Sequence, residues 1–391
     1  MLNTPFSSWP SYSNEEADAV RRVLLSNKVN YWTGREGQEF EKEYAAFADC
    51  EYAVAVANGT VALELALKAI GVGAGDEVIV TSRTFIASVS AIVIVGATPV
   101  FADVDRDSQN ITADSILQVL TPKTKAIICV HLAGWPCEMD EIMTLSGSHN
   151  LYVLEDCAQA HGARYNGKSV GSFGHIAAWS FCQDKIMTTG GEGGMVTTSD
   201  KELWSKMWSY KDHGKSLEAV YGKKHPSGFR WLHESFGTNW RMTEVQAAIG
   251  RIQLKKMSSW HKSRTINATA IMETSHNLSG LRAPVPPDDI EHAWYKCYLF
   301  VVPERLKTGW NRDRIMNAIV DNGVPCYSGS CSEVYLEMAF DNTGWRPSER
   351  LPVVRELGET SLMFLVHPTL TVAETEHTCS VLREVLERAT R

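Results

Sequence analysis

The sequence of 391 residues predicts an α/β protein with a large domain, built on a mostly parallel mixed sheet flanked by helices, and a smaller α+β domain after it. Short β-rich runs alternate with helical patterns as far as about Thr198, which is the signature of βαβ units. The later residues follow a connector rich in helix breakers and contain fewer, more scattered strands. The chain length also suits one domain of about 250 to 300 residues beside a smaller one.

The first βα unit shows the alternation most clearly. Tyr52–Ala57 is a strand candidate, and the helix predicted at Val61–Ile70 carries its apolar residues on one face. Further strands are predicted at Glu77–Thr81, Pro99–Ala102, Ala126–His131, Leu151–Glu155, His175–Phe181 and Met195–Thr198. Together these runs predict the single sheet of the large domain.

The second part of the chain begins with a helical stretch from Thr243 to about Ser275 and a connector at Arg282–Asp289. The elements predicted after it are a strand at Tyr298–Val302, a helix at Arg312–Asn322, a strand at Val324–Tyr327 and a closing amphipathic helix at Ala373–Arg388. We therefore predict a large domain over residues 1–250, and a linking helix with a small domain over residues 251–391.

Composition excludes several classes of protein. A formal net charge of −8 argues against general binding to nucleic acid or to an anionic membrane. The nine cysteines are scattered without a Cys-x-x-Cys pair, so no zinc site is predicted and a reducing compartment is favoured. The first residues lack the pattern of a signal peptide, and the longest apolar stretch is too short for a membrane helix. These features predict a cytoplasmic protein.

Two residues point to a pyridoxal phosphate site. Lys185 precedes a glycine-rich turn at Gly190–Gly194, and Asp156 ends an apolar strand. A lysine offered from such a turn can form an imine with the cofactor aldehyde, while a carboxylate can keep the pyridine nitrogen protonated. Each residue alone has a simpler interpretation, as a solvated lysine or as a helix cap. Their order along one chain favours the cofactor.

The segment Asn58-Gly59-Thr60 lies between the first strand and its helix, where free N–H groups and the helix dipole favour an anion. It is a candidate for holding a phosphate, although Asn58 alone is more simply a helix cap. Ser180 has the same two interpretations, because a hydroxyl at a strand end often bonds only the backbone.

These residues stand in a longer series of motifs, and with them the chain resembles the DegT/DnrJ/EryC1/StrS sugar aminotransferases, which are fold-type I pyridoxal phosphate enzymes. The resemblance extends over nearly the whole chain. The matching segments are Phe40–Tyr44, Asn58–Leu63, Gly75–Ile79, Thr84–Ser88, Glu155–Gln159, Ser180–Gly194 and Asn239–Glu244. The chain departs from the family pattern at Asn58, where serine is usual, and at Cys157, where a small residue is common.

The resemblance implies roles for individual residues. Lys185 would form the Schiff base and move the proton, and Asp156 would pair with the pyridine nitrogen. Gln159 would bond the ring hydroxyl, and Phe85 would stack on the ring, although a phenylalanine in an apolar run is more often part of a core. The remaining cofactor contacts would come from Asn58, Gly59, Thr60 and Ser180, and from Asn239 of the partner subunit in a homodimer.

The family contains sugar dehydratases with histidine in place of Lys185, so the lysine favours transamination. The resemblance implies that an amino acid, typically L-glutamate, donates its amine to a nucleotide-linked keto-sugar. A 4-keto-6-deoxyhexose for surface polysaccharide is favoured, with a 3-keto sugar or a cyclitol ketone as alternatives. A non-catalytic, cofactor-binding regulatory protein is the alternative from another class.

The acceptor pocket is harder to predict. The segment Lys211–Arg230 is rich in cations within an acidic chain, and we hypothesise that it binds the pyrophosphate of the nucleotide sugar, with a solvated loop as the alternative. The candidates for the sugar pocket, which sequence cannot rank against simple packing residues, are His131, Trp135, His213, Trp231 and Tyr327.

Overall fold

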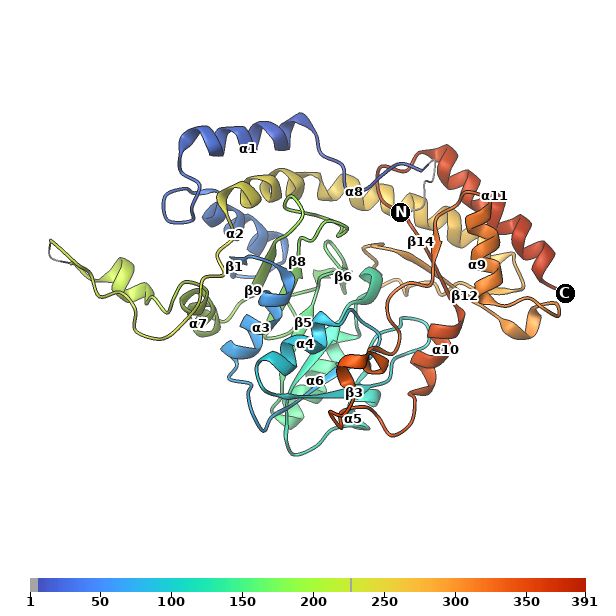
Figure 1. Cartoon of the computed structure of the whole chain (residues 1–391), viewed down its shortest axis with the longest axis horizontal. Helices are drawn as coiled ribbons and strands as arrows, with labels where there is room; N and C mark the ends of the chain where they lie inside the picture. Colours follow the sequence, from blue (N-terminus) through green and yellow to red (C-terminus); the bar gives the residue numbers. More distant parts are fainter. Residues whose placement is uncertain (1–5, 226) are drawn as a thin grey trace.

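The computed structural model of the chain describes residues 6–225 and 227–391. Its large domain is built on a seven-stranded sheet with the order β1-β9-β8-β5-β4-β2-β3 (Figure 1). The strands are β1 (Tyr52–Val56), β2 (Glu77–Thr81), β3 (Thr98–Ala102), β4 (Thr124–Val130), β5 (Tyr152–Asp156), β8 (Ile176–Ser180) and β9 (Gly194–Thr198). The pairs from β3 to β8 are parallel, whereas β9 runs antiparallel to both β8 and β1. The prediction of a mostly parallel mixed sheet is confirmed.

Alternating side chains build a core on each face of this sheet. Val78 and Val80 of β2 pack into one core with Leu65 of α3 (Gly59–Ala69), while Ile79 packs into the other with Ile142 of α6 (Met139–His149). The two-residue period of a strand sends neighbouring side chains to opposite faces. The other helices of this domain are α2 (Glu36–Phe47), α4 (Ala87–Ile94), α5 (Ala113–Leu117) and α7 (Lys201–Lys211).

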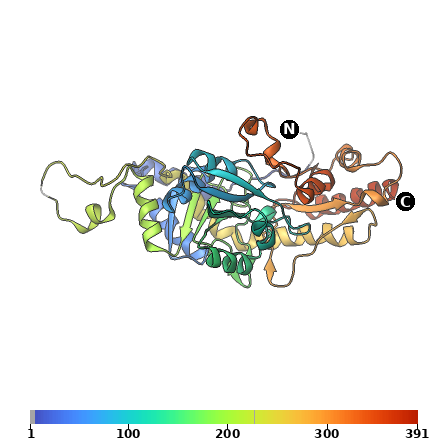
Figure 2. The same cartoon turned by 90° about the horizontal axis from the view of Figure 1, so that it is seen from below.

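Helix α8 (Glu244–His276) connects the two parts of the molecule, as Figures 1 and 2 show. It begins with a capping box, in which the Thr243 hydroxyl accepts from the Gln246 N–H and the Gln246 side chain accepts from the Thr243 N–H. Near its start it packs against α1 (Asn14–Ser26) and α2, and farther along against α11 (Val372–Ala389). The predicted boundary at residue 250 falls inside α8, and we propose that this helix belongs to both domains.

The small domain contains a four-stranded antiparallel sheet with the order β10-β12-β14-β13. Its strands are β10 (Leu281–Arg282), β12 (Cys297–Val301), β13 (Cys326–Tyr327) and β14 (Ser361–Phe364), and its helices are α9 (Arg312–Asp321), α10 (Pro352–Thr360) and α11. The predicted connector returns to the large domain, because β11 (Ile290–Glu291) pairs with β6 (Arg164–Tyr165), which also pairs with β7 (Lys168–Ser169).

The segment between α7 and α8 projects from the body of the molecule (yellow-green in Figures 1 and 2), and we call residues 213–238 the arm. The arm carries a π-helical turn at Glu218–Gly222. Its two ends are joined where the His213 N–H donates to the Thr238 carbonyl over 3.0 Å. Lys211, counted above among the cations of this region, is instead buried against Glu41 at 3.1 Å, so it offers no charge at the surface.

No helix of the described residues combines the length and the apolar character needed to cross a bilayer.

Candidate active site

A cavity of about 870 Å³ lies at the carboxyl ends of the parallel strands, where ligands bind in open α/β sheets. Strand β1 leads to Asn58, β5 ends at Asp156 and β8 ends at Ser180, so the fold brings these distant residues together. Of the nine site residues taken from the sequence, the cavity is lined by Asn58, Gly59, Thr60, Phe85, Asp156, Gln159, Ser180 and Lys185.

Asp156 is buried and held by two donors. The Ser88 hydroxyl donates to its Oδ2 over 2.8 Å, and the Ala158 N–H donates to its Oδ1 over 3.1 Å. Burial raises the pKa of Asp156, and the two hydrogen bonds and nearby Lys185 offset part of that rise. A cationic N–H facing this carboxylate would lower the pKa further, so the environment suits a protonated pyridine nitrogen.

Ser88 was missed as a functional residue from sequence. Its Oγ also lies 2.9 Å from the Thr84 Oγ1, which forms a short chain of hydroxyls leading to Asp156. The signal was present in the segment Thr84–Ser88, since residues four apart on a helical turn share a face. Only the packing of this turn against β5 shows what the serine contacts.

Lys185 lies in a turn held from both sides. Its N–H donates to the Cys182 carbonyl over 3.1 Å, and its carbonyl accepts from the Trp9 indole N–H over 2.8 Å. The ammonium lies 5.2 Å from the centre of the Tyr295 ring. Burial alone would raise the pKa of neighbouring Asp184, but Lys185 and the Tyr295 hydroxyl lower it overall. An ionised Asp184 therefore balances part of the positive charge beside Lys185.

The first turn of α3 forms a cradle for an anion. Asn58 caps the helix through its Oδ1, which accepts from the Val61 N–H over 3.0 Å, so the capping interpretation describes this side chain. A Cβ added at Gly59 would lie 2.6 Å from the Cβ of Ser180, which means that this close approach requires glycine. The Gly59 and Thr60 N–H groups belong to the helix start and have no acceptor within the helix. The cradle fits a phosphate.

Phe85 and Gln159 come from separate segments of the sequence and line the same cavity. Phe85 is 66% exposed, which contradicts the simpler interpretation of this residue as part of the core. Gln159 is buried, and its Oε1 accepts from the Ala133 N–H over 2.8 Å. Its NH₂ group is therefore the part that it can present to a ring oxygen. These positions fit the ring of pyridoxal phosphate, just as Asp156 and the cradle fit its two ends.

Asn239 is the one predicted cofactor contact outside the cavity. It is exposed at the base of the arm, where its backbone bridges to Asp212. Its Oδ1 accepts only a long 3.4 Å bond from the Arg241 N–H among the described residues. Asn239 therefore does not line the cavity of its own subunit.

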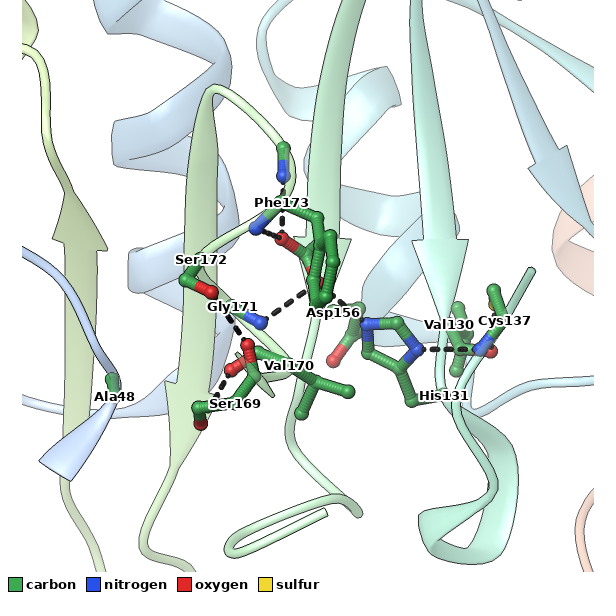
Figure 3. A network of polar contacts seen from close by, with 12 residues as sticks. Ala48, Val130, His131, Cys137, Asp156, Ser169, Val170, Gly171, Ser172 and Phe173 are labelled. Atoms are coloured by element: carbon green, nitrogen blue, oxygen red, sulfur yellow. Dashed lines mark hydrogen bonds and ion pairs between the residues drawn. The ribbon is translucent and has the colours of Figure 1, made fainter. Parts of the chain in front are cut away.

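Two of the candidates for the sugar pocket are buried outside the cavity. Figure 3 shows His131 within a network of polar contacts; its Nε2 lies 2.9 Å from Glu155, and its Nδ1 accepts from the Cys137 N–H. Glu155 also accepts from the N–H groups of Gly171, Phe173 and Gly174. Because both ring nitrogens are used, His131 braces the strand ends and has no free atom for a metal or a sugar.

Trp135 is also buried, 7% exposed, and packs against His292, so neither its ring nor that of His131 reaches the cavity. Tyr327 does line the cavity, while His213 and Trp231 lie on the arm. The small domain adds further wall residues that the sequence did not reveal, namely Tyr295, Lys296, Tyr298 and Ser330. They lie far along the chain from the motif and belong to no local pattern of their own.

The fold and this constellation define a fold-type I pyridoxal-phosphate-dependent transferase. The chain belongs to the DegT/DnrJ/EryC1/StrS aminotransferase family, whose model matches residues 10–383. It is accordingly an aminotransferase, and its cofactor is pyridoxal phosphate.

Solved and curated relatives cover nearly the whole chain. An aminotransferase from Psychrobacter cryohalolentis is 62% identical, with a TM-score of 0.96 over 98% of this chain and 99% of that one. GDP-perosamine synthase of Escherichia coli O157:H7 is 35% identical over 96% of each chain. The dTDP-3-amino-3,4,6-trideoxy-alpha-D-glucose transaminase of Streptomyces venezuelae is 34% identical over 95% of this chain and 92% of the relative.

Proposed function

We propose that this aminotransferase moves an amino group from an amino acid, L-glutamate, to a nucleotide-linked keto-sugar. The observation that carries the proposal is a single cavity that contains an amine at Lys185, a buried carboxylate at Asp156 and an anion cradle at Gly59 and Ser180. An amine and a carboxylate at opposite ends of one cofactor are what transamination requires. A protein that only bound the cofactor would have no use for the carboxylate.

Each of the predicted site residues has a separate role in this reaction. Bound pyridoxal phosphate supplies an electron sink for negative charge at the reacting carbon. In each half-reaction the Lys185 Nζ would move a proton between the substrate carbon and the cofactor carbon that carries the nitrogen, a role worth about 10² to 10⁴ in rate. Asp156 keeps the ring nitrogen protonated, Gln159 and Phe85 fix the plane of the ring, and the cradle anchors the phosphate.

For the acceptor we propose a nucleotide-linked 4-keto-6-deoxyhexose that is consumed in the synthesis of surface polysaccharide. The GDP-perosamine synthase relative supports a nucleotide sugar as the substrate class. A 3-keto sugar is the second candidate, favoured by the relative from Streptomyces, which is named for a 3-amino sugar attached to dTDP. Because the two relatives are almost equally identical to this chain, relatedness alone does not decide between the two carbons.

We further propose that the working unit is a homodimer with shared active sites, located in the cytoplasm. The arm carries four large exposed side chains, at 65 to 101% exposure, and such a surface is typical of an interaction site. They are Tyr221, Phe229, Trp231 and Phe236. An arm covered by a second copy would also bring Asn239 toward the partner's cofactor.

The absorption spectrum of the purified holoenzyme tests the function. We expect a visible band from the cofactor held by Lys185, and we expect L-glutamate to convert it to the band of the aminated cofactor. The band should be abnormal in Lys185→Ala and normal in Lys123→Ala, because Lys123 is an exposed lysine far from the cavity. A band that no amino acid changes would favour the non-catalytic alternative, and conversion by glutamate would justify a screen of nucleotide keto-sugars.

A further inference from the structure

A second cavity of about 310 Å³ adjoins the active site on the side of the small domain. The two cavities share a wall that includes Asp184, Tyr295 and Lys296. Arg264 of α8 lines only the second cavity, and so does Trp9, whose indole bonds the Lys185 carbonyl. This smaller space therefore lies directly behind the turn that carries Lys185.

Arg264 is a buried cation that forms no ion pair with any residue in 6–225 or 227–391. Its side chain is 1% exposed, and its Nη1 donates at 3.2 and 3.4 Å to the carbonyls of Trp294 and Tyr295. Its Nε is buried with no partner among the described residues. Burial lowers the pKa of Arg264 to about 9, so the guanidinium is still charged at neutral pH. The Arg264 Cζ lies 5.2 Å from the centre of the Trp9 ring, a cation–π contact that offsets only part of the cost of burying this charge, so an anion in the cavity would be favoured.

Lys296, half-buried on the shared wall, is a second cation that forms no ion pair with the described residues. Burial lowers the pKa of Lys296 to about 8, although nearby Asp184 raises it in part. No carboxylate oxygen of the described residues lies within 4.0 Å of either Lys296 or Arg264. Asp184 accepts from the Tyr295 hydroxyl instead. Burial also lowers the pKa of His367, which lines the second cavity, to about 4, so this ring is neutral at pH 7 and adds no further positive charge.

We propose that Lys296 and Arg264 together bind the side-chain carboxylate of a dicarboxylic amino donor. The inference rests on the proposed function, because it assumes that an amino acid reacts beside Lys185. A donor whose amine meets the reacting centre would extend its side chain past Lys296 toward Arg264. Arg264 lines only the second cavity, which none of the cradle residues Gly59, Thr60 and Ser180 lines, so a phosphate in the cradle does not pair with it. Charge-assisted bonds to a carboxylate would satisfy both.

Glutamate and glutamine test this assignment, because they have the same shape and differ in the charge of the side chain. We expect wild-type holoenzyme to convert its cofactor band with glutamate much faster than with glutamine. In Lys296→Gln, kcat/KM for glutamate in this half-reaction should fall about 10- to 100-fold, as expected for the loss of a charge-assisted bond, while the value for glutamine changes little. Arg264→Lys keeps the charge but loses the paired N–H donors of the guanidinium. It should show a smaller fall in kcat/KM for glutamate, again with little change for glutamine.

The matched control is Lys255→Gln, which changes an exposed lysine on the same helix as Arg264 and should behave as wild type. A second measurement is the calorimetric affinity of holoenzyme for glutarate, which cannot transaminate; we expect Lys296→Gln to weaken it by a similar factor. Equal losses for glutamate and glutamine, or unchanged glutarate binding, would overturn the proposal. If no amino acid converts the wild-type cofactor band, the proposed function fails instead, so the two failures are distinguishable.

Discussion

The ionisation of Asp156 is set by a small number of neighbours. Burial favours the neutral acid, while Ser88 and the Ala158 N–H favour the carboxylate. The balance matters because only the ionised form can stabilise a protonated pyridine nitrogen. Because of this balance, Asp156 and Ser88 are the most informative residues of the cavity to substitute singly.

Replacing Asp156 with alanine should leave the cofactor bound but lower kcat for transamination by about 10² to 10³, the usual effect of losing a preorganised charge. The physical reason is that an unprotonated ring is a poor electron sink. Steady-state rates with glutamate, together with the absorption spectrum, measure the two effects separately. Asp18→Ala, at an exposed position on α1, is the control. Near-normal turnover in Asp156→Ala would remove this residue from its proposed role.

Replacing Ser88 with alanine should move the acid limb of the pH profile. Loss of the 2.8 Å hydrogen bond raises the pKa of Asp156, so a smaller fraction is ionised at a given pH. The acid limb of kcat/KM should therefore shift upward, by about one pH unit for a bond to a charged acceptor. Ser90→Ala, in the same helix but without such a bond, should leave the profile in place. An unshifted limb in Ser88→Ala would separate this hydroxyl from the titration.

At the scale of elements, the sequence predicted strand bounds correctly where a continuous apolar run of neighbouring residues determines the strand. Strand β2 has the predicted bounds Glu77–Thr81, and β8 and β9 lie within a residue of theirs, because continuous buried runs bounded by turns favour strands. Strand β14 was missed, since Ser361–Phe364 is short and its pairing partners, β12 and β13, lie far away in the sequence. The same reason explains why the sequence pointed to the residues of the motif that line the cavity but not to Tyr295 and Lys296.

The arm provides a prediction at the scale of an element. Lys223 and Lys224 lie at its surface, and among the described residues Lys223 pairs with exposed Glu234 at 3.3 Å, so both cations are accessible to a pyrophosphate. Changing both to alanine should raise KM for the nucleotide sugar about 10-fold or more. The amino-acid half-reaction should be unchanged.

Separate kinetics of the two half-reactions measure this effect, with Lys123→Ala as the control for an exposed lysine. Equal effects on both half-reactions would contradict a role of the arm in acceptor binding. Effects on neither would indicate that the arm is a solvated loop.

At the scale of the whole molecule, the position of Asn239 leads to a test of shared sites. Subunits carrying Lys185→Ala should be inactive, and subunits carrying Asn239→Ala should be strongly impaired. If each site combines Lys185 of one chain with Asn239 of the other, a mixed dimer contains one intact site. Random exchange at equal amounts should then restore about one quarter of the wild-type activity.

Activity recovered on mixing is measured after exchange is complete, with each variant mixed with itself as the control. An absence of recovery, while mass measurements show that mixed dimers have formed, would count against the shared site. The residues around Asn239 do not by themselves show that it lies outside its own subunit's cavity, so the expectation of a shared site came from the family resemblance alone.

The closed base of the arm has a consequence for how substrate preference is encoded. His213 and Thr238 are hydrogen-bonded, and Asp212 bridges Asn239, so the segment leaves and rejoins the framework at nearly one point. An insert whose ends are already together can be exchanged without altering loop closure elsewhere. The residues near Lys296 and Arg264 belong to other elements. If the arm binds the acceptor as proposed, a graft of residues 213–238 from a relative should change the acceptor preference and leave the half-reaction with the amino donor unchanged.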